Sequence, residues 1–224
     1  TSLIIGNPDS RGAFGDQQRQ ERSVVLISGN NAGKLASGVT LYGGELIVGQ
    51  ATGDGTIGTT ATNALGSGTI SVMPVNFTFD DDEDDEAPEP ALTVSSDIAL
   101  STDLIVGDSR NFTLGGIISG NGEISIGVEE DSSVKVTFAG NNTFTGGIDI
   151  NNSNTATFTH DNATGKGGLG FDGQSGGTAN FETANPVVYG LESHGSSATL
   201  NLNYSGNRIF TINQAEDSRF KGNI

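Results

Sequence analysis

The stretch FAGNNTFTGGIDI, residues 138–150, decides how this chain folds. Apolar residues alternate with small or polar ones, and the alternation breaks at the Asn pair 141–142 and at the Gly pair 146–147. Asn and Gly tolerate the backbone angles and the close approaches that tight corners need. The pattern predicts a strand, a corner, a short strand, a second corner and a third strand. The residues expected to point inward are Phe144, Ile148 and Ile150. Such a unit buries its apolar face only when copies of it stack above and below.

The composition of the whole chain is that of a β-protein with many corners. Its 224 residues include 34 glycines, five prolines and no tryptophan, and no run of about 12 residues shows a helical period. The predicted fold is all-β: a single-stranded, right-handed parallel β-helix with protruding loops. With about 20–25 residues per coil and about 4.8 Å between coils, the length allows roughly ten coils. A pair of β-sandwich domains explains the alternation equally well at this point.

Sequence echoes suggest one domain built from repeats. ISGNN at 27–31 resembles FAGNN at 138–142, and ALGSGTISV at 64–72 resembles the Gly-rich stretch 167–181. The order of these signatures is the same in both halves of the chain. We therefore predict one β-helical repeat domain over residues 1–224, with copies at approximately 1–110 and 111–224 and an acidic loop at 79–90.

Acidic residues dominate the charge of the chain. The formal net charge is −17 at pH 7, which disfavours binding to the phosphate backbone of nucleic acids. Seven consecutive acids precede a Pro-containing segment and should repel one another into an extended, solvated loop. Clustered carboxylates are also ligands for Ca²⁺, so this run is a weak Ca²⁺ candidate, although it lacks the spacing of an EF-hand loop. The residues are Asp80, Asp81, Asp82, Glu83, Asp84, Asp85 and Glu86.

The chain contains no Cys, so it holds neither a disulfide framework nor a thiolate zinc site. No apolar run approaches the roughly 20 residues of a membrane-spanning helix. The first residue is Thr1 and the last is Ile224, and the sequence is interpreted as a mature, trimmed or partial chain.

Motifs that carry chemistry in other proteins occur here in unsuitable contexts. Residues 53–58 match G-x-G-x-x-G, but the following TTATNALGSG is a poor helix for a dinucleotide site. Residues 167–172 match the start of a calcium-binding nonapeptide, but only one copy is present. His160 and His194 are the only histidines, and no nearby serine has the context of a nucleophile. We therefore expect no cofactor-binding or catalytic residues.

A known family shares the pattern around the opening stretch. GNNTFTGGIDI at 140–150, with IISGNGEISI at 117–126 upstream and GGLG at 167–170 downstream, resembles the passenger-associated transport repeat of bacterial autotransporters. The resemblance is weaker at 29–48, where LASGVTLYGGEL replaces the repeat's core. It implies a parallel β-helix displayed on the surface of a Gram-negative bacterium.

These observations predict a structural or adhesive function. The chain is expected to be a segment of a secreted or cell-surface β-helix: a stalk, an adhesin scaffold or a subunit of an extracellular fibre. Its expected partners are neighbouring repeats of the same or like chains, and a host-surface or glycan ligand. The alternative is a polysaccharide-degrading or carbohydrate-binding β-helix. A degrading enzyme of this fold would need paired carboxylates or a basic residue on one groove.

Overall fold

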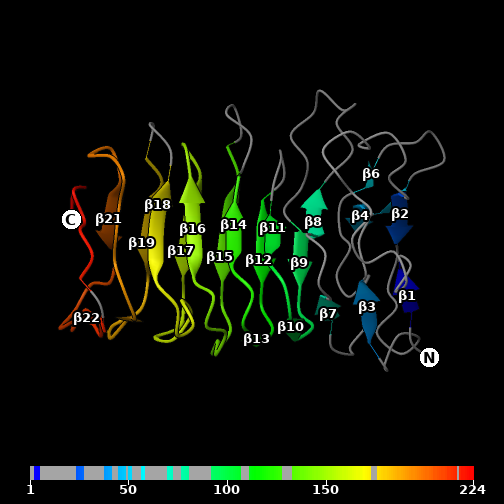
Figure 1. Ribbon diagram of the computed structural model, residues 1–224, viewed down its shortest axis with the longest axis horizontal. Coiled ribbons are helices and arrows are strands. Elements are labelled where there is room, and N and C mark those ends of the chain that lie inside the picture. The colour runs from blue at the N-terminus through cyan, green and yellow to red at the C-terminus, as the bar shows by residue number, and fades with distance from the viewer. Residues whose placement is uncertain are drawn as a thin grey trace.

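The computed structural model describes most of the chain beyond residue 91 and short segments before it. The described residues are 3–5, 24–27, 38–41, 45–48, 50–51, 57–58, 70–72, 77–80, 92–106, 111–127, 133–172, 176–215 and 217–224. Within them there is no helix, and every regular element is a strand. Figure 1 shows the strands stacked along the longest axis of a rod, with the N-terminus at one end and the C-terminus at the other.

Three parallel sheets run along the rod. The five-stranded sheet contains β1 (Leu3–Ile5), β3 (Val39–Leu41), β7 (Ile70–Val72), β10 (Ile98–Leu100) and β13 (Ile118–Gly120). The seven-stranded sheet contains β2 (Val24–Ile27), β4 (Glu45–Val48), β8 (Phe77–Asp80), β11 (Leu104–Val106), β14 (Ile124–Ile126), β16 (Ile148–Asn151) and β18 (Leu169–Asp172). The six-stranded sheet contains β9 (Leu92–Val94), β12 (Phe112–Leu114), β15 (Lys135–Phe138), β17 (Thr155–Phe158), β19 (Thr178–Phe181) and β21 (Thr199–Leu202).

Two short pairs complete the strands. β20 (Val187–Val188) pairs in parallel with β22 (Thr211–Ile212), and β5 (Gln50–Ala51) pairs antiparallel with β6 (Ile57–Gly58). In the three large sheets all pairings are parallel, and the chain visits each sheet in turn, as in β10, β11, β12 and then β13. This order confirms the parallel β-helix. β-Sandwich domains are ruled out, because they require antiparallel sheets.

The coil length is regular only in the second half of the rod. Ile98 pairs with Ile118 in the next coil, and Ile124 pairs with Ile148, so these coils have the predicted length. Among the earlier residues the spacing varies: Val24 pairs with Glu45, whereas Val39 pairs with Ile70 across a clearly longer coil. The described residues form fewer coils than the ten expected, since the longest sheet has seven strands.

The structural repeat is the single coil. Ile27 ends β2 in the seven-stranded sheet, whereas Phe138 ends β15 in the six-stranded sheet. The echo between residues 27–31 and 138–142 therefore does not join equivalent positions of the helix. The division into copies at 1–110 and 111–224 stays a prediction from sequence.

The opening stretch folds largely as predicted. Its predicted inward residues Phe144, Ile148 and Ile150 are buried, and the second corner contains Gly147 at a φ of 103°. The middle segment is not a regular strand. It nevertheless continues the line of the five-stranded sheet, because the backbone N–H of Thr143 donates to the carbonyl of Ile118 over 2.8 Å.

The core is a ladder of identical or similar side chains from successive coils. The rings of Phe138 and Phe158 stack with centroids 5.4 Å apart, and those of Phe158 and Phe181 stack at 4.9 Å. Phe210 closes this row against Phe181 with an edge contact at 5.2 Å. Register alignment places equivalent residues directly above one another, so each apolar side chain finds its partner in the next coil.

Two buried asparagines hold the corners between coils. The Asn142 side chain accepts the backbone N–H of Ile118 at 2.8 Å and donates to the carbonyl of Ala163 at 2.7 Å. It therefore joins the coil below to the coil above. Asn154 accepts the backbone N–H of Val134 at 2.7 Å and donates to the carbonyl of Gly127 at 3.3 Å. Both amides substitute for backbone hydrogen bonds that the corner geometry interrupts.

Replacing Asn154 by alanine should destabilise the chain by about 2–3 kcal/mol, because the N–H of Val134 would be left buried without an acceptor. Thermal unfolding followed by far-UV circular dichroism measures the effect. Asn203→Ala is the matched control, since Asn203 is exposed and its hydrogen bond to Asn180 is long, at 3.5 Å. If both variants lost the same stability, the buried amide would not hold the corner.

Candidate functional site

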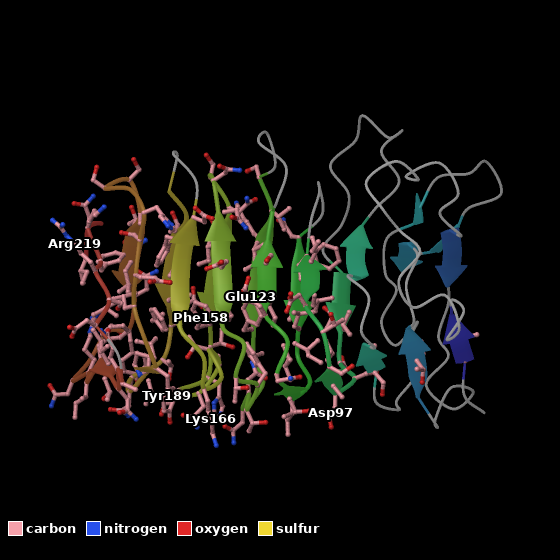
Figure 2. All side chains as sticks on the ribbon, viewed as in Figure 1. Asp97, Glu123, Phe158, Lys166, Tyr189 and Arg219 are labelled. Carbon is pink, nitrogen blue, oxygen red and sulfur yellow. The ribbon has the colours of Figure 1, made fainter. Side chains whose placement is uncertain are left out.

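A pair of carboxyl groups lies on the outer face of the seven-stranded sheet. Glu123 immediately precedes β14, and Asp149 is the second residue of β16, the next strand of that sheet. The two carboxyl groups are close enough for each to shift the pKa of the other. The backbone N–H of Glu123 also donates to Asp103 at 2.8 Å, and the Ser125 hydroxyl donates to the Glu123 carboxyl at 3.4 Å. We call Glu123 and Asp149 the carboxyl pair; Figure 2 shows Glu123 near the middle of the rod.

The sheet makes room for Asp149 through a glycine. Strand pairing places Gly170 of β18 opposite Asp149, where a Cβ atom would overlap the Asp149 carboxyl group. The missing side chain lets this carboxyl lie against the backbone of the next coil. It is therefore partly withdrawn from water, which disfavours its charged form.

Burial and neighbouring acids raise the pKa of both members of the pair. For Asp149, burial is the main cause, followed by the charges of Asp172 and Glu192, while His194 acts in the opposite direction on its pKa. For Glu123, burial again comes first, followed by the charges of Asp149 and Asp103. Two neighbouring carboxyl groups oppose simultaneous ionisation, so the pair keeps a proton more readily than separate groups do. The pair can thus donate or accept a proton as a general acid or base.

The pair makes the stability of the rod depend on pH. The ordinary pKa values are 4.5 for Glu123 and 3.8 for Asp149. Because the folded chain holds these protons to higher pH than the unfolded chain, the pair favours folding below the ordinary values and loses that contribution as the pH rises through the raised pKa values. We expect Glu123→Gln to unfold at a higher temperature than the parent near pH 7, and the gap to shrink in acid.

Glu182→Gln is the matched control for this experiment, because it removes one negative charge from an exposed position after β19. Asp161 has a lowered pKa, because the Thr183 hydroxyl and the backbone N–H of Asn185 donate to it. Its contribution to stability therefore grows as the pH rises, opposite to that of the carboxyl pair, and it is the same in the parent and in both variants. Parallel melting-temperature profiles for Glu123→Gln and the parent between about pH 4 and 7 would refute the role of the pair.

A second polar site lies at the C-terminal end of the rod. It is a hollow of about 430 Å³, which we call the terminal pocket, lined by Glu192, Ser193, His194, Asp217, Ser218, Arg219 and Lys221. The segment 217–221 runs along 191–194 as the next coil: the N–H of Ser193 donates to the carbonyl of Arg219 at 3.0 Å. Figure 2 shows Arg219 at this end.

The histidines lie in ordinary surroundings. His194 at the edge of the terminal pocket contacts Asp172, with Nδ1 and a carboxylate oxygen 3.2 Å apart, and both side chains are more than half exposed. The Nδ1 atom of His160 accepts the backbone N–H of Asn162 at 3.1 Å within a local turn. Neither contact assembles a nucleophile with a base.

The acidic run lies almost entirely outside the described residues. Asp80 is the last residue of β8, and residues 81–86 are not described, so the weak Ca²⁺ candidate stays a prediction. Elsewhere in the described part of the chain no group of three or more His, Asp or Glu residues is placed to hold a metal ion. Of the G-x-G-x-x-G motif, Ile57–Gly58 forms strand β6, and Asp172 of the nonapeptide-like motif ends β18.

The carboxyl pair and the terminal pocket were not found by sequence reasoning. Ser125, not Glu123, is in register with Asp149, so the pair joins neighbouring outward positions that are out of register. Glu123 and Asp149 are separated in the sequence by about the length of one coil, which was the available signal. It could be used only after the corners of each coil had been located.

Within the described residues, no helix is long and apolar enough to cross a membrane. Comparisons of the chain with models of protein families, with curated proteins and with solved structures gave no match.

Proposed function

We propose that this chain is a structural and adhesive segment of a secreted or cell-surface β-helix, with no catalytic activity of its own. The role fits a stalk, a scaffold that carries adhesive loops, or a subunit of an extracellular fibre. The proposed location is outside the cell, on the surface of a Gram-negative bacterium, as the resemblance to autotransporter passenger repeats implies. The proposed partners are like repeats and a glycan or host-surface ligand.

The continuous ladder between coils carries this proposal. Phenylalanine rings from three successive coils stack in one row. The buried Asn142 side chain bonds to the coils on both sides of it, and the buried Asn154 side chain bonds to the preceding coil. Each coil is held mainly by its neighbours, so the rod resists bending along its length while its loops remain free to vary. This is the mechanical behaviour that a stalk or scaffold needs.

Single-molecule pulling between the two termini tests the scaffold role. A rod of stacked coils should give a series of force steps as coils detach one after another from an end, because contacts are confined to neighbours. Asn154→Ala should lower the force of the steps in its own region of the chain. A chain that extends at forces no higher than those of an unfolded polypeptide would contradict a mechanical role.

The carboxyl pair favours a second candidate, a polysaccharide-degrading β-helix enzyme. Hydrolysis of a glycosidic bond uses two carboxyl groups about 5–9.5 Å apart, one of which has a raised pKa and protonates the leaving group. A member of the carboxyl pair would be this acid, and a nearby carboxylate such as Asp172 or Glu192 would be its partner. Incubation with a panel of purified polysaccharides, with and without Ca²⁺, tests this candidate by release of reducing ends. Turnover that disappears in both Glu123→Gln and Asp149→Asn would establish the enzyme and overturn the scaffold-only role.

A further inference from the structure

We propose that the terminal pocket binds a sugar that carries a single carboxylate, such as a uronic acid residue within a glycan. The inference rests on the proposed adhesive function for its setting and goes further by naming the site and the chemical class of the ligand. It is carried by the shape of the pocket and by the charged side chains that line it.

The pocket has the size and composition of a site for a polar ligand. Its volume of about 430 Å³ lies in the range of roughly 300–1,000 Å³ that is usual for small-molecule sites. All seven lining residues are polar or charged, and none is aromatic apart from the imidazole of His194. The lining therefore suits a ligand that offers several hydrogen-bonding groups, as a sugar does.

The two serines of the pocket are used by the fold. Ser193 donates its hydroxyl to the carbonyl of Gly195 at 2.9 Å and accepts the backbone N–H of Lys221 at 2.9 Å. Ser218 donates its hydroxyl to the carbonyl of Leu191 at 2.7 Å. These bonds fix the backbone of 217–221 against the preceding coil, and they leave the charged side chains as the groups available to a ligand.

Within the described part of the chain, the positive charges of the pocket form no ion pair. Among the described residues, neither Arg219 nor Lys221 makes an ion pair, and the ammonium of Lys221 donates only to the backbone carbonyl of His194 at 3.0 Å. The two residues alternate along one segment and line the same pocket, in a chain whose net charge is −17. A guanidinium beside an ammonium suits a carboxylate, which a guanidinium binds through two parallel hydrogen bonds.

The acidic residues of the pocket favour a singly charged anion as its ligand. Glu192 and Asp217 lie in the same hollow and repel a doubly charged phosphate more strongly than a singly charged carboxylate. Their carboxylates accept hydrogen bonds from hydroxyl groups, which a sugar ring supplies at several positions. One carboxylate with adjacent hydroxyls therefore satisfies both the cations and the acids.

Isothermal titration calorimetry of the 224-residue chain with a galactotriose whose terminal residue is a galacturonate, and which therefore carries one carboxylate, tests the proposal. We expect saturable binding, no binding of neutral galactotriose, and at least a tenfold weaker affinity in the double variant Arg219→Gln, Lys221→Gln. The matched control is Lys135→Gln, Lys166→Gln, which removes the same charge from exposed positions outside the pocket and should bind as the parent does.

Each other outcome overturns the proposal. Absence of binding at millimolar concentrations of the trisaccharide with one galacturonate, equal binding of galactotriose, tighter binding of a sulfated trisaccharide, or equal loss in both double variants would each do so. Far-UV circular dichroism of every variant verifies that it is folded. If the sugar fails to bind but the pulling experiment still shows force steps, the ligand site is refuted and the scaffold role is retained. If the force steps are absent, the scaffold role is refuted.

Discussion

Replacing Gly147 by valine should lower the stability of the rod by about 3 kcal/mol or more, since a β-branched residue rarely adopts a positive φ. Gly147 has a φ of 103°, and a Cβ atom there would lie 2.9 Å from the carbonyl oxygen of Gly168 in the next coil. That carbonyl accepts the backbone N–H of Ile148 at 2.9 Å. A side chain at 147 therefore strains its own backbone and disturbs the ladder that begins β16.

Thermal unfolding by far-UV circular dichroism measures this loss, which corresponds to a fall in melting temperature of about 6–12 °C for a chain of this length. Gly168→Val is the matched control: it lies at the same kind of corner, without a positive φ, and a Cβ atom there meets nothing within 4 Å. His160→Ala should also have a smaller effect. Equal melting temperatures for Gly147→Val and the parent would show that the corner does not depend on glycine.

Replacing Phe158 by alanine should destabilise the rod by about 3–5 kcal/mol. Its ring lies between those of Phe138 and Phe181 in the stacked row and is fully buried. Truncation removes apolar contacts with two coils at once and leaves a cavity, because the register holds the neighbouring rings at their own levels. The two ring contacts add to the loss expected from burial alone.

Thr157→Ala is the matched control, since Thr157 precedes Phe158 in β17 and is not buried. It should change stability by about 0.5–1 kcal/mol. Phe158→Leu should recover part of the loss, because leucine refills part of the cavity. Chemical denaturation of the three variants measures the order. A Phe158→Ala variant as stable as Thr157→Ala would mean that the stacked row does not carry the core.

The architecture was predictable because its signals are local. Alternation within residues 138–150 decides which side chains are buried, and residues at the Asn and Gly corners show where the chain turns. Phe144, Ile148 and Ile150 are therefore buried as expected. The sequence also favours strands over helices throughout, since side chains at every second position share one face of a strand.

The features that depend on contacts between coils were not predictable. Asn142 marks a corner in the sequence, but its bonds to Ile118 and Ala163 appear only once three coils are stacked. The carboxyl pair depends on an offset between Glu123 and Asp149 along neighbouring strands. Coil length also differs between the two halves of the rod. The offset between residues of neighbouring strands is therefore known only when the pairing register of the strands is known.

The distances between spin labels on one face of the rod test the central claim, that the coils stack in register as a parallel β-helix. The chain has no Cys, so pairs of introduced cysteines carry the only labels. Positions Thr93, Thr113 and Asn201 lie in one outward row of the six-stranded sheet. We expect backbone separations of about 19 Å from 113 to 201 and about 24 Å from 93 to 201, one strand spacing more. Separations that do not grow by about 4.8 Å per strand would contradict the fold and the proposal that rests on it.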